Sequence, residues 1–225
     1  MTTEHRFVAT DDAGEVTGLL AVPREARLVH VFAHGAGAGM RHAFMEAACW
    51  ELGLRGIATF RYQFPYMEAG RRAPNPGPVL MGTVRSAVAE AARLAPGLPL
   101  VAGGKSMGGR MTSLAAAEEA LPEVRGLAFF GFPLHGAGKA PSAERGAHLA
   151  DVGLPMLFLQ GDRDSLADLS LLEPLLSRVH PRPVLHVEAG ADHGFHVLKR
   201  SGRTDEEVLR ALCDRFAAWA DDLVG

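Results

Sequence analysis

A single serine stands between glycines at residues 104–108, where two segments with different hydrophobic patterns meet. Residues 98–103 form a short apolar run that predicts a buried strand, and the alanine-rich segment after Ser106 has a helical pattern. A turn this tight brings its flanking residues together, so a side chain at Gly104 or Gly108 would crowd it. The helix that begins after Ser106 directs backbone N–H groups and the positive end of its dipole at any anion formed there.

Residues 104–108 match the G-x-S-x-G pattern, in which a sharp strand-to-helix turn exposes a nucleophilic serine hydroxyl at the edge of a sheet. Gly-Lys-Ser also occurs in phosphate-binding loops, but that motif requires a glycine where Pro99 stands. A turn with an incidental serine is the remaining alternative. The strand before Ser106 and the helix after it favour the nucleophile.

The rest of the chain alternates short apolar runs with helical patterns. Two strands, 5–9 and 16–22, flank a turn at 11–14 and predict an antiparallel hairpin. Further strands are expected at 27–33, 56–61, 124–130, 155–160 and 183–187, and helices at 41–54, 79–94, 165–178 and 204–223. Residues 62–78 form a proline-rich connection, and residues 131–150, which lack a clear period, leave room for a short lid only. This alternation implies an α/β fold, with a mostly parallel sheet covered by helices on both faces.

Composition narrows the class of protein. The chain has 225 residues, 48% of them hydrophobic, which suits a single domain over residues 1–225. A net charge of -3 without a basic stripe gives no reason to expect a nucleic-acid partner. The sequence has neither a signal peptide nor an apolar run of the ~20 residues that span a bilayer, so we expect a soluble cytoplasmic protein with no membrane association. Cys49 and Cys213 are expected to be reduced, and the oligomeric state is left open.

A serine nucleophile needs a histidine base, which in this type of fold follows the serine and the acid along the chain. Four histidines satisfy that order. His186 lies within a predicted strand and His180 at a helix end, whereas His193 lies in a glycine-flanked loop directly after the last strand. His193 is therefore the predicted base, and His196 is the reserve. A zinc site built on His193 and His196 is disfavoured because no third ligand stands at suitable spacing, so no metal or cofactor is expected.

The acid should lie in the loop after the strand at 155–160. Asp164 is favoured because it follows the turn glycine by three residues and precedes a helix, whereas Asp168 should already belong to that helix. Asp162 remains an alternative acid, although a turn-stabilising role suits it better. Asp192 is interpreted as a brace of its own loop.

Attack of Ser106 on a carbonyl creates an oxyanion that needs donors fixed in advance. One donor should be the backbone N–H of Met107. The second should come from the loop at 34–37, where the N–H of Ala36 or Gly37 is preferred and His34 holds the loop.

A substrate pocket is expected to draw on residues 62–78, 132–148 and 194–198. Some of the aromatic side chains there can hold an acyl or alcohol group, although the same side chains also suit a core. Arg61 and His135 either meet a substrate carboxylate or pair with acidic side chains to hold loops. With so short a lid region, small or medium acyl substrates are favoured over long lipids. The predicted contacts are Arg61, Phe64, Tyr66, Phe132, His135 and Phe195.

Six segments together resemble one α/β-hydrolase family. They are residues 34–37, 61–67, 103–110, 132–135, 157–164 and 192–193, and they match in order over residues 30–200. The family contains testis-expressed protein 30 and the third regulatory subunit of the non-specific-lethal chromatin complex, and it is similar to dienelactone hydrolases. The resemblance implies an α/β-hydrolase fold with Ser106, Asp164 and His193 at the triad positions.

The chain departs from these relatives at two places. The family often has Phe-Asn where this sequence has Tyr62-Gln63. Dienelactone hydrolases usually have a cysteine nucleophile where this chain has Ser106, so the resemblance does not imply lactone specificity. Two functions follow as hypotheses: a serine esterase that acts on a small acyl substrate through an acyl-enzyme, or a catalytically silent domain that binds a protein partner.

Overall fold

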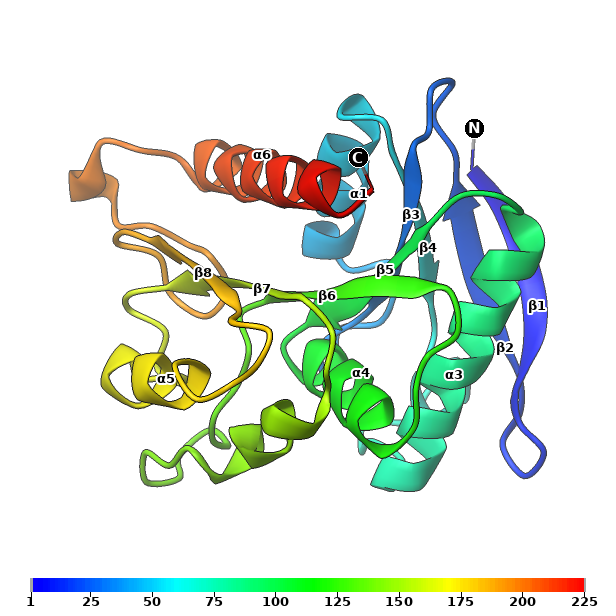
Figure 1. Ribbon diagram of the computed structural model, residues 1–225, viewed down its shortest axis with the longest axis horizontal. Helices are drawn as coiled ribbons and strands as arrows, with labels where there is room; N and C mark the ends of the chain where they lie inside the picture. Colours follow the sequence, from blue (N-terminus) through cyan, green and yellow to red (C-terminus); the bar gives the residue numbers. More distant parts are fainter. Residues whose placement is uncertain (1, 225) are drawn as a thin grey trace.

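The computed structural model describes residues 2–224 and is built around one eight-stranded sheet (Figure 1). Its strand order is β1-β2-β4-β3-β5-β6-β7-β8. The strands are β1 (Thr2–Thr10), β2 (Gly14–Ala21), β3 (Leu28–Ala33), β4 (Ile57–Tyr62), β5 (Leu100–Lys105), β6 (Val124–Phe130), β7 (Met156–Gly161) and β8 (Val184–Glu188).

Strands β3 to β8 run parallel, and the hairpin β1–β2 joins this sheet antiparallel through the pairing of β2 with β4. The predicted hairpin and parallel sheet are therefore confirmed. Parallel strands end at the same edge of a sheet, so the loops that follow β3, β5, β7 and β8 gather at one edge. The residues expected to carry chemistry lie in these four loops.

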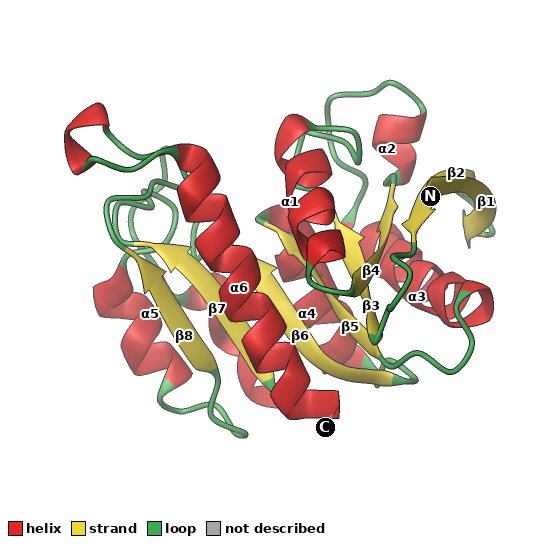
Figure 2. Cartoon of the chain, turned by 90° about the horizontal axis from the view of Figure 1, so that it is seen from above, coloured by secondary structure: helices red, strands yellow, loops and turns green. Residues whose placement is uncertain are grey.

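Helices cover the two faces of the sheet (Figure 2). On one face lie α1 (Ala43–Leu54) and α6 (Asp205–Val224), which contact each other. On the other lie α3 (Gly77–Leu94), α4 (Met107–Glu118) and α5 (Leu169–Leu176). A buried cluster fills each side of the sheet, and the cluster beneath α1 and α6 includes Phe32, Phe130 and Phe216. The mostly parallel α/β sheet with helices on both faces is the predicted fold class.

The connections contain short helices that the sequence patterns did not reveal. Within the proline-rich segment, Pro65 begins the four-residue helix α2 (Pro65–Glu68), where its missing N–H costs nothing. The lid region contains the 3₁₀ helix η1 (Glu144–Asp151), and the loop after β8 contains η2 (Lys199–Ser201).

Helix α5 is shorter than expected because Asp168 acts as its N-cap instead of lying within it. The Asp168 carboxylate accepts a hydrogen bond from the Ser170 N–H at 2.8 Å. Cys49 and Cys213 are buried free thiols. Within residues 2–224, no helix combines the length and apolar character that crossing a membrane requires.

Candidate active site

Ser106 stands at the turn between β5 and α4 in a conformation that few non-glycine residues adopt. Its φ is 51° and its ψ is -117°, and the backbone carbonyl of Phe130 accepts its N–H at 3.1 Å. The two flanking glycines permit this turn. A Cβ at either Gly104 or Gly108 would lie 2.5 Å from the carbonyl oxygen of Ala33. The sequence-based account of these glycines therefore matches the observed close contacts.

His193 links Ser106 to Asp164 through two short hydrogen bonds. Its Nε2 lies 2.8 Å from Ser106 Oγ, and its Nδ1 lies 2.7 Å from Asp164 Oδ2. A carboxylate only accepts hydrogen bonds, so Nδ1 carries the proton and the free Nε2 lone pair faces the serine hydroxyl. This orientation lets His193 take a proton from Ser106.

Asp164 is held in place by two further donors. The Gln160 side-chain amide donates to Asp164 Oδ2 at 2.5 Å, and the Leu166 N–H donates to Oδ1 at 2.7 Å. The side chain of Asp164 is fully buried, whereas that of His193 is 23% exposed. Burial of an ion needs such donors to offset its lost hydration. Gln160, at the end of β7, was not predicted, although a polar residue in an otherwise apolar strand was a visible signal.

The alternative acids and the reserve histidine have other contacts. Asp162 accepts the Gly190 N–H at 2.8 Å, and Asp192 accepts the N–H groups of Gly194 and His196. Both therefore brace loops, as expected for Asp192. His196 Nδ1 lies 2.6 Å from Asp205 Oδ2 at the beginning of α6, and this carboxylate raises the pKa of His196. None of these three residues takes the place of Asp164 or His193 in the hydrogen-bonded chain that begins at Ser106.

The three predicted oxyanion donors differ in where their N–H groups lie relative to the cavity beside Ser106. Met107 is the first residue of α4, a position at which a helical N–H has no acceptor within the helix. Ala36 lines the same cavity as Ser106. The N–H of Gly37 instead donates to the Tyr66 hydroxyl at 3.1 Å. The geometry therefore favours Ala36 over Gly37 as the second donor.

His34 holds the loop that carries Ala36. Its Nδ1 donates to the Gly35 carbonyl at 2.8 Å, and its Nε2 accepts the Phe64 N–H at 3.1 Å. Burial lowers the pKa of His34 to about 4, so the imidazole is neutral at pH 7. A neutral ring is required because a protonated Nε2 could not accept that N–H. The structural role predicted for His34 agrees with these contacts.

A mainly apolar cavity of about 560 Å³ opens beside Ser106 between α1 and α6. Phe195 lies on its wall, as expected, with a φ of 66° and its ring stacked on that of Phe44 at 5.9 Å between centroids. The beginnings of α1 and α6 supply the rest of the wall. Residues of the wall that sequence reasoning missed are Ala43, Phe44, Met45, Ala47, Leu166 and Leu209.

Lys105 brings a positive charge to this apolar wall. Its ammonium donates to the backbone carbonyl of His193 and lies 5.1 Å from the centre of the Phe195 ring and 5.7 Å from that of Phe44. Burial lowers the pKa of Lys105 to about 8, although Asp164 and Asp192 raise it in part. The side chain thus joins β5, α1 and the loop of His193.

Four of the predicted substrate contacts do not line this cavity. Phe64, Tyr66 and Phe132 are fully buried in the core on the opposite face of the sheet. Their apolar character reflects packing, which the sequence could not distinguish from a pocket wall. His135 lies beside Asp168 in a separate hollow, where its Nδ1 is 3.2 Å from the Gly136 carbonyl.

Arg61 is likewise absent from the Ser106 cavity. It lines a different groove between α1 and the β1–β2 hairpin, with its Nη2 3.6 Å from Glu46 Oε1. The structure therefore gives no support to the expected contact between Arg61 and a substrate at Ser106. Of its two predicted roles, pairing with an acidic side chain agrees better with the structure.

A second serine–histidine hydrogen bond lies outside the cavity. Ser113 Oγ is 2.7 Å from His148 Nε2. Ser113 is fully buried within α4, and burial lowers the pKa of His148 to about 4. No ion pair between His148 and a carboxylate occurs in the described part of the chain. Ser113 is therefore closed to a substrate, whereas Ser106 lines an open cavity, and the histidine beside Ser113 has no paired carboxylate among the described residues to orient it.

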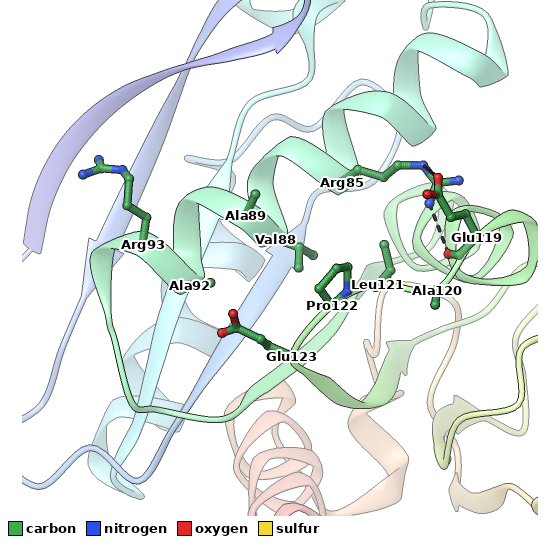
Figure 3. A pocket seen from close by; sticks show the side chains of 10 residues that line it. All are labelled: Arg85, Val88, Ala89, Ala92, Arg93, Glu119, Ala120, Leu121, Pro122 and Glu123. Atoms are coloured by element: carbon green, nitrogen blue, oxygen red, sulfur yellow. Dashed lines mark hydrogen bonds and ion pairs between the residues drawn. The ribbon is translucent and has the colours of Figure 1, made fainter.

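Another cavity, of about 430 Å³, lies between α3 and the loop that joins α4 to β6 (Figure 3). Figure 3 shows Arg85 turned toward Glu119, while Arg93 points away from the cavity. Arg85 donates to the carbonyls of Ala115 and Glu119 and pairs with Glu118 at 2.8 Å. The guanidinium of Arg85 is thus already paired, and neither Ser106, His193 nor Asp164 lines this cavity.

Comparison with solved structures gives the same fold across the whole chain. The esterase domain of a Rhodothermus marinus protein is 16% identical with a TM-score of 0.74, each chain being covered over 100% of its length. Dienelactone hydrolase from Anabaena variabilis is 20% identical with a TM-score of 0.75, covering 99% of this chain and 98% of its own. XC6422 from Xanthomonas campestris, described as an α/β serine hydrolase without a lid, is 20% identical with a TM-score of 0.71, covering 96% and 94%.

A search of curated proteins gave no significant match. A scan of known protein families matches residues 26–221 to a family described as "Alpha/beta hydrolase domain". The match spans β3 to α6 and includes Ser106, Asp164 and His193. The chain therefore belongs to the α/β-hydrolase domain family.

Proposed function

We propose that this protein is a serine hydrolase that cleaves a carboxylic ester, thioester or related acyl bond of a small to medium substrate. The observation that carries this proposal is the hydrogen-bonded chain from Ser106 through His193 to Asp164, which opens onto an apolar cavity. His193 accepts the proton of the Ser106 hydroxyl, and Asp164 orients His193 and stabilises the positive charge that the imidazole then carries.

In the proposed cycle, Ser106 Oγ attacks the substrate carbonyl carbon while His193 Nε2 takes the hydroxyl proton. The N–H groups of Met107 and Ala36 stabilise the resulting oxyanion, each contributing about 3 kcal/mol. The tetrahedral intermediate collapses to an acyl-enzyme as the leaving group receives the proton from His193. Water, deprotonated by His193, then attacks the acyl carbonyl and releases a carboxylic acid and the free serine.

The cavity supports a preference for apolar acyl groups of limited size. Its volume is about 560 Å³, and its wall is mainly apolar and includes alanine, phenylalanine and leucine side chains. Two structural neighbours are described as an esterase domain and a dienelactone hydrolase, which agrees with acyl-bond chemistry. Within the α/β hydrolases, we propose that the chain is related to the family of testis-expressed protein 30 and the third non-specific-lethal subunit, on the sequence segments described above.

The test is covalent labelling of the purified protein with a fluorophosphonate, followed by mass spectrometry to locate the adduct. We expect labelling on Ser106 in the wild type and none in Ser106→Ala, with a large loss of rate in His193→Ala. Ser113→Ala is the matched control and should label as the wild type does. A folded wild-type protein without an adduct on Ser106 would overturn the proposal and favour a catalytically silent binding domain.

A further inference from the structure

A second groove lies on the other side of α1 from the Ser106 cavity. It has a volume of about 360 Å³ and runs between α1 and the β1–β2 hairpin. Glu46, Cys49 and Trp50 of α1 line this groove, whereas Ala43 and Ala47 of the same helix line the cavity of Ser106. The two spaces therefore share a wall but have separate linings.

Arg61 lies in this groove as an incompletely paired cation. Its side chain is only 12% exposed, and its Nη1 is buried with no hydrogen-bond partner within residues 2–224. Its neighbour Glu46 is 3.6 Å from Nη2, beyond ordinary hydrogen-bond distance, and that carboxylate is 53% exposed. An arginine stays protonated, so this guanidinium has lost hydration without gaining a close bidentate acceptor. A carboxylate from outside would supply one.

Large apolar side chains surround the same groove and are exposed to solvent. Trp50 is 70% exposed, Leu54 65% and Val22 40%, and all three line it. They account for half of the six large hydrophobic residues that are exposed in the described part of the chain. A concave site with apolar walls and one charged group is typical of a site for a small organic ligand.

We propose that this groove binds a small carboxylic acid with an apolar body. Its carboxylate pairs with Arg61 in place of Glu46, and its hydrocarbon part packs against Trp50, Leu54 and Val22. Binding in this groove does not involve Ser106 and does not require a reaction at Ser106. Displacement of Glu46 costs little because that side chain is half exposed and its contact with Arg61 is long.

The test uses 3-phenylpropionate as the probe and the fluorescence of Trp50 as the signal. The other tryptophan, Trp219, is 8% exposed. The titration is repeated with Trp219→Phe, in which Trp50 is the remaining tryptophan and any change in tryptophan fluorescence comes from it. All titrations are made with Ser106→Ala, so that no chemistry at Ser106 contributes. We expect a saturable change with 3-phenylpropionate and at least about tenfold weaker binding of its uncharged amide.

Two variants test the pairing directly. Arg61→Gln should weaken binding at least about tenfold, whereas Glu46→Gln should tighten it because the competing carboxylate is gone. Arg93→Gln, an exposed arginine on α3, is the matched control and should change nothing. A gain of affinity in Glu46→Gln is a result that mere damage to the fold would not produce.

The proposal is overturned if the acid and its amide bind equally, or if Glu46→Gln leaves the affinity unchanged or lowers it. It is also overturned if a folded Arg61→Gln variant binds as the wild type does. Should Arg61→Gln fail to fold, the amide and Glu46→Gln comparisons still decide. Fluorophosphonate labelling of Ser106 in the Arg61→Gln and Glu46→Gln proteins is measured separately, so the outcome at this groove is distinguishable from that of the proposed hydrolase.

Discussion

The side-chain amide of Gln160 donates a hydrogen bond of 2.5 Å to Asp164 Oδ2, the same oxygen that accepts from His193. Gln160 is fully buried, and its Oε1 accepts the Phe132 N–H at 2.9 Å. The amide thus ties the end of β7 to the loop after β6 and fixes the carboxylate that orients His193. Its orientation is determined because only Nε2 can donate to Asp164 and only Oε1 can accept from Phe132.

We expect Gln160→Glu to slow the reaction of Ser106 with a fluorophosphonate by about tenfold or more. The new side chain keeps an acceptor for Phe132 but exchanges the amide donor, whose bond to a charged group is worth about 1.5–3 kcal/mol, for a second buried carboxyl group. The two carboxyl groups then share one proton, so Asp164 loses part of the negative charge that orients His193. The measurement is the second-order labelling rate at pH 7. Asp168→Asn, which retains a cap for α5, is the control, and an unchanged rate in Gln160→Glu would show that His193 needs no such support.

The sequence carried the information for the Ser106–His193–Asp164 arrangement because each part depends on local pattern and chain order. Gly104 and Gly108 identify the turn, and the loops after β7 and β8 must reach the edge where Ser106 stands. The cavity wall could not be predicted in the same way. It depends on where the first turns of α1 and α6 lie in space, and buried phenylalanines such as Phe64 and Phe132 look no different in sequence from those of a pocket.

The buried histidines predict a loss of stability in mild acid. Burial lowers the pKa of His30 to about 4, and its Nδ1 donates to the Val101 carbonyl at 3.0 Å. Between pH 6.5 and 4 the unfolded chain therefore binds a proton that the folded protein does not, so the free energy of unfolding falls as the pH falls through this window. For one such histidine the loss is on the order of 3 kcal/mol.

We expect His30→Leu to show a shallower decline in the free energy of unfolding between pH 6.5 and 4 than the wild type. The leucine removes the buried titrating group while keeping an apolar side chain among Phe32, Phe130 and Phe216. Urea denaturation at a series of pH values gives both curves. Parallel curves for the two proteins would contradict this assignment, and only the difference in slope counts, because carboxylates elsewhere titrate in both.

Tyr66 stabilises the loop that carries Ala36, since its hydroxyl accepts a hydrogen bond from the Gly37 N–H. We expect Tyr66→Phe to lower kcat/KM for p-nitrophenyl butyrate by about 2- to 10-fold, the equivalent of one net hydrogen bond. Tyr62→Phe is the matched control, since it removes the other buried tyrosine hydroxyl, near Thr112. Equal losses of activity in both variants would point to general destabilisation instead of an effect on the loop.

Lys105 should make the reaction sensitive to alkaline pH. Because burial lowers its pKa to about 8, the ammonium that lies over Phe44 and Phe195 is lost above that pH. Between pH 8 and 10.5 the unfolded chain holds a proton that the folded protein has released, so Lys105 makes the free energy of unfolding rise with pH. Over the same range the contacts of its ammonium with Phe44, Phe195 and the His193 carbonyl weaken.

We expect Lys105→Met to label more slowly than the wild type at pH 7, by about tenfold, because the His193 carbonyl loses a charged donor. The fall of the wild-type labelling rate above about pH 8 should be absent from the variant. Rates measured from pH 6 to 10 test this, with Lys139→Met, an exposed lysine, as the control. Persistence of the same alkaline decline in Lys105→Met would assign it to another group.

The close packing of the Ser106 turn predicts a clear contrast between two glycines. A Cβ at Gly108 would lie 2.5 Å from the Ala33 carbonyl oxygen and 2.6 Å from that of His34, both backbone atoms that cannot move aside easily. Gly108→Ala should therefore lower the free energy of unfolding by roughly 1–3 kcal/mol and slow labelling of Ser106. Gly53 lies within α1, and a Cβ there would meet nothing within 4 Å, so Gly53→Ala should raise stability by roughly 0.5–1 kcal/mol. Urea denaturation of both variants measures the contrast, and a Gly108→Ala protein as stable as the wild type would show that β3 and the turn are less tightly packed than these distances require.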